Sequence, residues 1–337
     1  MNQHVHLLDR VETPSRLGGR FRTFDGLIVA AAIAAVPLTA ASFFGRLYWL
    51  MELLTHFRLH FVIGAAVLFL AAFARRRFAA AMLAAAVAAA NVSPLVPYIV
   101  AGPAVAEAGE PEIRIMAANV HLHNFDYAAL RELIAEENPD VVGLMEVNRQ
   151  WVDELSSLRP EYPYSILHPE DGAYGLALLS RIPLRESEAS PYVEDGIQAA
   201  IVAELEWRNE RVTTVLAHLK APVTPRNAAL RNRQIVAITQ LITSDRNEKQ
   251  ILFGDLNTTP WSPWYLPLER EAKLVNAARG RGYHPTWPSG FGFLKIPIDH
   301  CLFSEGFHVR QIRNGADIGS DHMPLIVDVA IAAKQAG

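Results

Sequence analysis

The amino-acid sequence predicts an α/β sandwich preceded by membrane-spanning helices. Residues 24–105 consist almost entirely of Ala, Leu, Val, Ile and Phe, whereas residues 107–337 have the mixed composition of a soluble domain. In this C-terminal part, short apolar segments alternate with helical patterns, and several of the segments are apolar throughout. Strands that are buried on both faces have this pattern, so we expect sheets that are covered by helices.

Three apolar runs form the membrane part, Leu27–Phe44, Leu59–Ala74 and Phe78–Val100. About 20 apolar residues cross the hydrocarbon core of a bilayer. The first and third runs reach this length and the second is marginal, so we expect a three-helix anchor over residues 24–105. A cleaved signal peptide explains the first run less well, because two more apolar runs follow it.

The placement of arginine predicts the orientation of this anchor. Arginines gather before the first run and between the second and third, at positions 10, 16, 20, 22 and 75–77. Loops rich in Lys and Arg stay in the cytoplasm. Residues 1–23 should therefore be cytoplasmic, in a multi-pass protein of the inner cell membrane whose large C-terminal domain is extracytoplasmic. The lone Cys301 suits an exported domain without a disulfide framework.

The soluble part is acidic, which bears on its partners. Of the 31 Lys and Arg residues 9 precede residue 107, and of the 35 Asp and Glu residues 4 do, which leaves 22 basic and 31 acidic residues after that point. Domains that grip long nucleic acids usually have a basic face, so nucleic acid is the less favoured partner. Arg226, Arg231 and Arg233 lie on an expected helix, where they read as a solvated face.

The elements of the soluble part follow in order. A linker over residues 106–111 leads into a domain over residues 112–331, and residues 332–337 form a tail. Asp126 is a suitable N-cap for a helix that runs to Glu137, and a second helix is expected over Asn227–Thr243. The expected strands are Ile113–Asn119, Val141–Met145, Leu176–Leu179, residues 199–205, Val212–Leu216, Ile251–Phe253, Ile298–Phe303 and Leu325–Val329.

Polar residues stand at the ends of these strands. They are Asn119, Glu146, His218, Asp255 with Asn257, Asp299, and Asp321 with His322. Each alone has a structural explanation, such as a loop carboxylate or a histidine at the edge of the core. Catalytic residues, however, collect at one rim of a rigid sheet. Carboxylates, an amide and imidazoles together are what a hard metal ion and an activated water require.

Together these residues resemble the motifs of the endonuclease/exonuclease/phosphatase superfamily, over about residues 112–331 and in the family's order. The stretches Gly254-Asp255-Leu256-Asn257 and Ser320-Asp321-His322 are the most specific part of the resemblance. It implies a four-layered α/β sandwich, with two mixed sheets face to face and helices outside. The membrane part looks like the bacterial membrane-bound branch of the superfamily, one member type of which is associated with teicoplanin resistance.

The resemblance also implies a role for each residue. Glu146 would be the principal metal ligand, with Asn119 close by and Asp321 near the same or a second metal. The metal would be Mg²⁺, with Mn²⁺ as the alternative, and no organic cofactor is expected. His322 would act as the general base or polarise the phosphate, and Asp299 would orient that histidine. Asp255 and Asn257 would position the attacking water and the phosphoryl oxygens. His218 would donate to a phosphate oxygen or to the leaving group.

Two positions depart from the family pattern. His121 stands where some apurinic endonucleases have an acidic residue, which weakens any expectation of their metal geometry or abasic-site preference. The carboxylate that supports the His218-type histidine cannot be identified by motif, and Glu170, Asp171 and Glu186 are candidates.

Aromatic residues near the motifs suggest contact with substrate or lipid. Trp261 follows the Asp255 motif, and Trp287, Phe291 and Phe293 precede Asp299. Such side chains sit well at a water–lipid boundary, although some of them could be core. We expect a phosphorylated substrate, and we favour a lipid or polyprenyl-phosphate head group. We expect residues 24–105 to bind the lipid bilayer. An exported nuclease is the first alternative and a non-catalytic anchored binding module the second, while the oligomeric state stays open.

Overall fold

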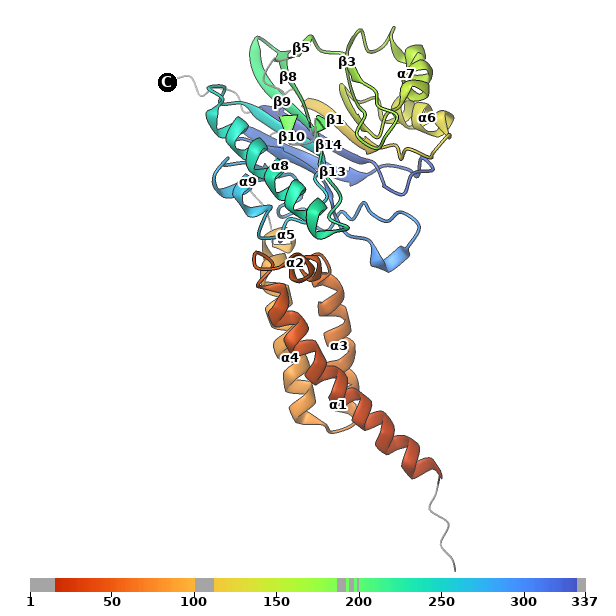
Figure 1. Cartoon of the computed structure of the whole chain (residues 1–337), viewed down its shortest axis with the longest axis vertical. Helices are drawn as coiled ribbons and strands as arrows, with labels where there is room; N and C mark the ends of the chain where they lie inside the picture. Colours follow the sequence, from red (N-terminus) through yellow and green to blue (C-terminus); the bar gives the residue numbers. More distant parts are fainter. Residues whose placement is uncertain (1–15, 101–111, 187–191, 194–196, 199, 332–337) are drawn as a thin grey trace, which may run out of the picture. The chain divides into compact units, whose positions relative to one another are not determined.

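A computed structural model describes residues 16–100, 112–186, 192–193, 197–198 and 200–331 of the protein (Figure 1). The chain divides into two compact units. The first contains the chain up to Ala40 together with Leu59–Val92, and the second contains Ala41–Arg58 together with the chain from Ser93 onward.

The first unit is a set of apolar helices, α1 (Arg16–Ser42), α3 (Arg58–Ala74) and α4 (Phe78–Val92). Their contacts are made largely by small residues, which allow helices in lipid to approach closely; the buried cluster is Ile28, Ala32, Ala72, Ala80 and Ala81. The Asp25 carboxylate accepts hydrogen bonds from Arg75 Nε at 2.7 Å and from Arg77 Nη2 at 2.9 Å. The arginine-rich turn is therefore tied to the first helix.

Two helical segments are long and apolar enough to cross a membrane, Thr23–Ser42 and Phe78–Ile99. The second of these continues α4 through the short helices η1 (Ser93–Leu95) and α5 (Val96–Ile99). A third candidate arises only if α2 (Trp49–Thr55) and α3, which are bent at the break between them, count as one span. The second apolar run was predicted to be only marginally long enough to cross a membrane, and the structure agrees, because α3 counts as a span only together with α2.

The second unit contains two six-stranded sheets, with strand orders β13-β14-β1-β2-β4-β3 and β11-β12-β10-β9-β8-β5. In each sheet one neighbouring pair is parallel, β1 with β2 and β9 with β10, and the other pairs are antiparallel. The strands are β1 (Glu112–Asn119), β2 (Val141–Met145), β3 (Tyr164–His168), β4 (Leu176–Ser180), β5 (Leu184–Glu186), β8 (Ala200–Trp207), β9 (Glu210–His218), β10 (Gln250–Asp255), β11 (Val275–Asn276), β12 (Asp299–Phe303), β13 (Phe307–Asn314) and β14 (Leu325–Ile331), and β6 (Tyr192–Val193) pairs with β7 (Ile197–Gln198) in a separate ribbon. The helices are α6 (Tyr127–Glu137), α7 (Arg149–Leu155), α8 (Pro225–Ser244) and α9 (Leu266–Arg270), with 3-10 turns η2 (Ser156–Leu158) and η3 (Gly292–Leu294).

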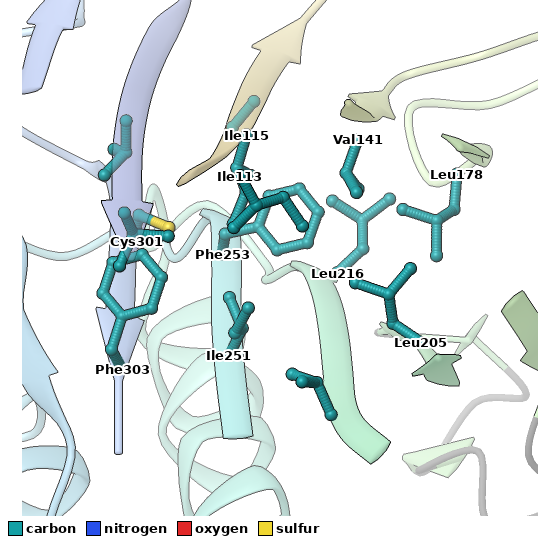
Figure 2. Close-up of a cluster of buried hydrophobic side chains, with 14 of the residues drawn as sticks. Ile113, Ile115, Val141, Leu178, Leu205, Leu216, Ile251, Phe253, Cys301 and Phe303 are labelled. Carbon is teal, nitrogen blue, oxygen red and sulfur yellow. The ribbon is translucent and has the colours of Figure 1, made fainter. Parts of the chain in front are cut away.

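The two sheets pack face to face, and helices cover their outer faces. Residues from both sheets form one buried cluster between them, in which Ile115 and Val141 come from the first sheet and Leu216 and Phe253 from the second (Figure 2). Helices α6 and α7 pack on one outer face, and α8 and α9 on the other (Figure 1). The predicted four-layered α/β sandwich is therefore confirmed.

The elements of this unit that were predicted correctly are those with a continuous apolar run or a clear helix cap in the sequence. Asp126 caps α6 by accepting from the backbone N–H of Ala129, as expected, and the predicted central strands and long helix are present within a few residues. Strands β3, β5, β11 and β13 and the short helices α7 and α9 were not predicted from the sequence. Strands β3 and β13 lie at the edges of their sheet and bury few side chains, so their sequences lack the continuous apolar run of a central strand.

Candidate active site

The first pair of site residues stands at the ends of the parallel strands β1 and β2. Asn119 ends β1 and lies in register with Met145, so that Glu146 follows directly beside it. Asn119 Nδ2 donates to Glu146 Oε1 at 3.0 Å, and the backbone N–H of Leu122 donates to Oε2 at 2.8 Å. Glu146 has φ 64°, a left-handed conformation that non-glycine residues adopt rarely and that clusters at functional sites.

Three further site residues lie at the same edge of neighbouring strands of the second sheet: His218 and Asp255 are the last residues of β9 and β10, and Asp299 is the first residue of the antiparallel β12. His218 and Asp299 each lie in register with Asp255, on the two strands that flank β10. Gly254, just before Asp255, has φ 124°, and a Cβ at this position would lie 2.1 Å from the carbonyl oxygen of Ala217. Only glycine permits this close approach of β10 to β9. The glycine of the Gly-Asp motif therefore places the carboxylate that follows it.

The Asp255 carboxylate joins the contributions of the two sheets. It is buried and accepts hydrogen bonds from Asn119 Nδ2 at 3.3 Å, from the Asn257 backbone N–H at 2.8 Å and from Asn257 Nδ2 at 3.2 Å. Burial, and then repulsion by the Asp299 carboxylate, raise the pKa of Asp255 to about 8. The strand ends that the sequence placed at separate positions thus meet at one edge of the sandwich.

His322 lies between two carboxylates. Its Nδ1 is 2.8 Å from Asp299 Oδ2, and its Nε2 is 3.7 Å from Asp255 Oδ2. Burial of the ring acts to lower its pKa, but the carboxylates of Asp299 and Asp255 outweigh burial and raise the pKa of His322 to about 10. The predicted pairing of Asp299 with His322 is therefore present in the geometry, with Nε2 as the ring atom that remains for a substrate.

His218 approaches a carboxylate that the sequence analysis did not propose. Its Nε2 lies 3.6 Å from Asp255 Oδ2. Within the part of the chain that the structure describes, Glu170 and Asp171 form no ion pair with it, and the side chain of Glu186 lies outside that part. Burial lowers the pKa of His218 to about 4, so the ring is neutral at physiological pH and one nitrogen carries a proton that it can donate.

Asp321 and His121 lie near Glu146. Trp287 Nε1 donates to Asp321 Oδ2 at 3.1 Å, while His121 Nδ1 is 3.2 Å from Asp321 Oδ1 and 3.8 Å from Glu146 Oε2. His121, which the sequence marked only as a departure from the family pattern, therefore contacts both carboxylates that were predicted to bind metal.

Donors that suit a hard divalent cation gather at two places, Glu146 with Asp321 around His121, and the group of Asp255, Asp299 and His322. Asp255, Asp299 and His322 present ligand atoms that all lie within 4.8 Å of one another. Asp321 Oδ1 is buried and, among the described residues, receives no hydrogen bond of good geometry, so it can still accept. Asn119 lies beside Glu146: its amide nitrogen donates to the carboxylates of Glu146 and Asp255, and its amide oxygen accepts from the backbone N–H of His121. It orients ligands more than it offers one.

The four predicted aromatic residues have different environments. Trp287 lines the same pocket as Glu146 and His322. Phe291 and Phe293 are 66% and 82% exposed, as a surface-facing loop requires. Trp261 is buried, at 6% exposed, and stacks on the ring of Tyr283. The expectation that Trp261 faces a substrate or lipid is therefore corrected, since its side chain packs inside the domain.

Two hydroxyl side chains that received no predicted role also support the site. Ser320 Oγ donates to the Asn119 carbonyl at 2.7 Å and accepts from the backbone N–H of His322 at 3.1 Å, which links the last motif to the first. Thr286 Oγ1 accepts from the backbone N–H of Asp299 at 3.2 Å. Ser and Thr are common in loops, so only the Ser-Asp-His motif itself could have drawn attention to Ser320.

Comparison with known families decides what this arrangement is. The family model described as "Endonuclease/Exonuclease/phosphatase family" matches residues 116–322, more than half of the chain. The chain belongs to this family. The matched region contains every strand-end residue described above, from Asn119 to His322. Membership of the endonuclease/exonuclease/phosphatase family makes the protein a metal-dependent phosphoric ester hydrolase by class. The membrane-bound branch of the family stays a prediction.

Solved structures agree with the fold. The chain is similar to D. rerio TDP2 complexed with single strand DNA product, with 16% identity, a TM-score of 0.54, and 65% of this chain and 99% of that chain covered. It is similar to the human Nocturnin catalytic domain with bound sulfate anion, with 19% identity, a TM-score of 0.52, and coverage of 66% and 96%. A family protein from Bacteroides thetaiotaomicron gives 15% identity, a TM-score of 0.54, and coverage of 66% and 99%. No curated protein sequence matches the chain.

Proposed function

We propose that the protein is a membrane-anchored, extracytoplasmic phosphoesterase that uses Mg²⁺ to hydrolyse a phosphodiester or phosphoanhydride in a lipid or polyprenyl-phosphate head group. The observation that carries this proposal is the convergence of the His322–Asp299 pair and Asp255 at the strand ends of the sandwich. Mn²⁺ is the alternative metal. The apolar segments Thr23–Ser42 and Phe78–Ile99 support the anchor.

The reaction needs a water oxygen to attack phosphorus while the bond from phosphorus to the leaving oxygen breaks and that oxygen gains a proton. Asp299 engages His322 Nδ1, which leaves Nε2 for the substrate. With its pKa raised to about 10, the ring is protonated at neutral pH, so Nε2 donates to a phosphoryl oxygen, and only the neutral form of the ring could take the proton from water. His218, held neutral, can donate to a phosphoryl oxygen or to the leaving group. Asp255 and Asn257 would position water and phosphate.

Glu146 and Asp321 are the residues that we assign to the metal, with Asn119 orienting Glu146. A bound Mg²⁺ neutralises charge on the phosphoryl oxygens, which is its usual contribution to phosphoryl transfer. Because such catalysis consists mainly of positioning and charge neutralisation, the residue set suffices without a covalent nucleophile.

The location is proposed from charge. The arginine-rich turn at residues 75–77 favours the cytoplasm, which leaves the catalytic domain on the outer side of the inner membrane. In that compartment a phosphorylated lipid head group is an accessible substrate, which supports the proposal of a lipid phosphoesterase.

An exported nuclease is the second candidate. It is favoured by the single strand DNA product in the similar D. rerio TDP2 structure, and it is disfavoured by the excess of acidic over basic residues after residue 106. A non-catalytic binding module is the third, and the complete set of strand-end residues argues against it, because a decayed site would be expected to lose one of them.

The test uses the full chain in detergent and bis-p-nitrophenyl phosphate as substrate. We expect hydrolysis to require a divalent cation, and Glu146→Ala or Asp255→Ala to lower kcat/KM by about 10²-fold or more, since each removes a ligand or preorganised group. Glu161→Gln, whose side chain is 59% exposed, is the control and should keep full activity. Full activity in excess chelator would contradict the proposal. Rapid digestion of DNA that falls steeply with salt would favour the nuclease.

A further inference from the structure

Helix α2 belongs to the same compact unit as the catalytic residues, and a buried ion pair fixes it there. Glu52, on α2, and Arg231, on α8, are 1% and 0% exposed. Arg231 Nη2 donates to both carboxylate oxygens of Glu52, at 2.6 and 2.5 Å, and Ser262 Oγ donates to Oε1 at 2.8 Å. Buried charges are tolerated when they are paired and hydrogen-bonded in this way, so α2 is docked specifically.

The same arginine connects α2 to the catalytic turn. Arg231 Nη1 donates to the carbonyl oxygen of Asn257 at 2.8 Å. Asn257 in turn donates its backbone N–H and its side-chain N–H to the Asp255 carboxylate. A continuous chain of hydrogen bonds therefore runs from Glu52 to Asp255.

His56 provides a second attachment just after α2. Its Nδ1 is 2.9 Å from Thr259 Oγ1, and the ring is buried. Its Nε2 is buried too, and among the described residues it has no hydrogen-bond partner, with Glu52 Oε1 3.9 Å away. Buried polar atoms normally find a partner, so a ligand atom or a bound water is expected at this nitrogen.

One pocket of about 450 Å³ contains both the catalytic residues and this segment. Its polar lining includes Glu146, Asp255 and His322. Its apolar lining includes Leu53 and Phe57, together with Val223, Ile296 and Ile298. Pockets of this size bind small ligands, and their lining chemistry predicts the chemistry of the ligand. A polar end and an apolar wall match a phosphoester whose second group is hydrocarbon.

We propose that Leu53 and Phe57, in the segment that His56 helps to anchor, form the specificity wall of the active site and bind the hydrocarbon group next to the phosphate of an amphiphilic phosphoester. This inference rests on the proposed phosphoesterase activity and specifies its substrate class. The wall is contributed by α2 and the turn after it, which connect the candidate span Thr23–Ser42 to the apolar helix α3. A lipid-borne phosphoester is therefore the occupant that we assign to this segment. A nucleotide would set its polar sugar and base against the same apolar side chains.

The test compares two phosphodiesters with the same leaving group, methyl p-nitrophenyl phosphate and hexyl p-nitrophenyl phosphate, on the full chain in detergent. We expect the wild type to favour the hexyl ester in kcat/KM by about tenfold or more, since even a single methylene in an apolar pocket gives about this discrimination. Leu53→Ala and Phe57→Ala should each reduce the hexyl-to-methyl ratio several-fold. Because the ratio is measured within each variant, a general loss of active protein does not affect it.

Leu50→Ala is the matched control. Leu50 lies on the same helix, is 47% exposed and is not among the residues that line the pocket, so its ratio should equal that of the wild type. An unchanged ratio in Leu53→Ala and Phe57→Ala would overturn the specificity wall. Binding of hexylphosphonate relative to methylphosphonate, measured calorimetrically in the same variants, separates the two proposals. If no ester is hydrolysed but the hexyl preference in binding depends on Leu53 and Phe57, the wall stands and the phosphoesterase proposal fails.

Discussion

At the scale of single residues, the site depends on how Asp299 holds His322. The Asp299 carboxylate and His322 Nδ1 are 2.8 Å apart and both side chains are buried. This contact fixes the orientation of the ring and leaves Nε2 for the substrate. Because a buried carboxylate without a partner is unfavourable, each residue depends on the other, and the two should act as one unit.

Double-mutant kinetics can test this unit. We expect His322→Ala to lower kcat by about 10²-fold or more, since it removes the group that handles a proton. Asp299→Ala should cost a comparable factor, and the double variant should lie within about threefold of His322→Ala, because residues that act together are non-additive. The measurement is steady-state hydrolysis of bis-p-nitrophenyl phosphate, with the exposed Glu305→Ala as control. Two losses that multiply would mean that the residues act independently.

Residue positions were more predictable than residue contacts. Strand ends followed by Asp, Asn or His identified Asp255 and His218, because register brings the ends of neighbouring strands together. The contact of His121 with Asp321 was not predictable, since His121 lies in a turn with φ 61° that no periodic pattern describes. Glu170, Asp171 and Glu186 were named as candidates for the carboxylate beside His218 without a motif to choose among them, whereas strand register brings Asp255 to 3.6 Å from its Nε2.

At the scale of elements, docking of α2 depends on a buried ion pair that joins two helices. The prediction that Arg231 belongs to a solvated helix face is wrong, because its side chain is fully buried against Glu52. Its partner is 179 positions away in the chain, so no local pattern could identify it. Arg233, two residues on, lies on a different face of α8 and is exposed.

Breaking this pair should destabilise the protein strongly. Glu52→Gln leaves the Arg231 charge buried without a counter-charge, and removal of one partner of a buried pair typically costs about 3–5 kcal/mol. The matched control is the Arg131–Glu154 pair, whose side chains are 35% and 41% exposed. Glu154→Gln should cost less than about 1 kcal/mol, as surface pairs do. Thermal unfolding of the full chain in detergent measures both shifts. Equal shifts in Glu52→Gln and Glu154→Gln would contradict the proposed docking of α2.

Elements with fully buried sequences were predicted, and those at edges were not. β2 has five buried residues in succession, and its predicted and observed bounds coincide at Val141–Met145. β13 buries only two of its eight residues, so alternation and apolar content are too weak to mark it. An edge strand is stabilised mainly by its hydrogen bonds to the neighbouring strand, and the residues of the edge strand alone do not reveal that neighbour.

At the scale of the whole molecule, composition divides the chain near residue 106, whereas contacts group Ala41–Arg58 with the C-terminal unit. The segment is apolar, like the helices on either side of it, so composition cannot separate it from them. Its polar residues Glu52 and His56 make their hydrogen bonds with the C-terminal unit. A soluble fragment that begins after residue 106 would therefore lack the carboxylate that pairs with Arg231, and the full chain is the form in which activity is best measured.

The predicted orientation of the molecule in a membrane rests on the same arginines that tie the turn to the first helix. If the turn at residues 75–77 is cytoplasmic, as the distribution of Lys and Arg favours, the chain after Ala106 is outside. An alkaline phosphatase reporter, which is active only outside the cytoplasm, should be active when fused after Ala106 and inactive when fused after Arg77. A fluorescent protein that matures only in the cytoplasm should give the opposite pattern at the same two positions, which controls for expression. The reverse result would place the active site in the cytoplasm, where the accessible phosphoesters are nucleic acids and nucleotides. It would therefore remove the main support for a lipid-linked substrate.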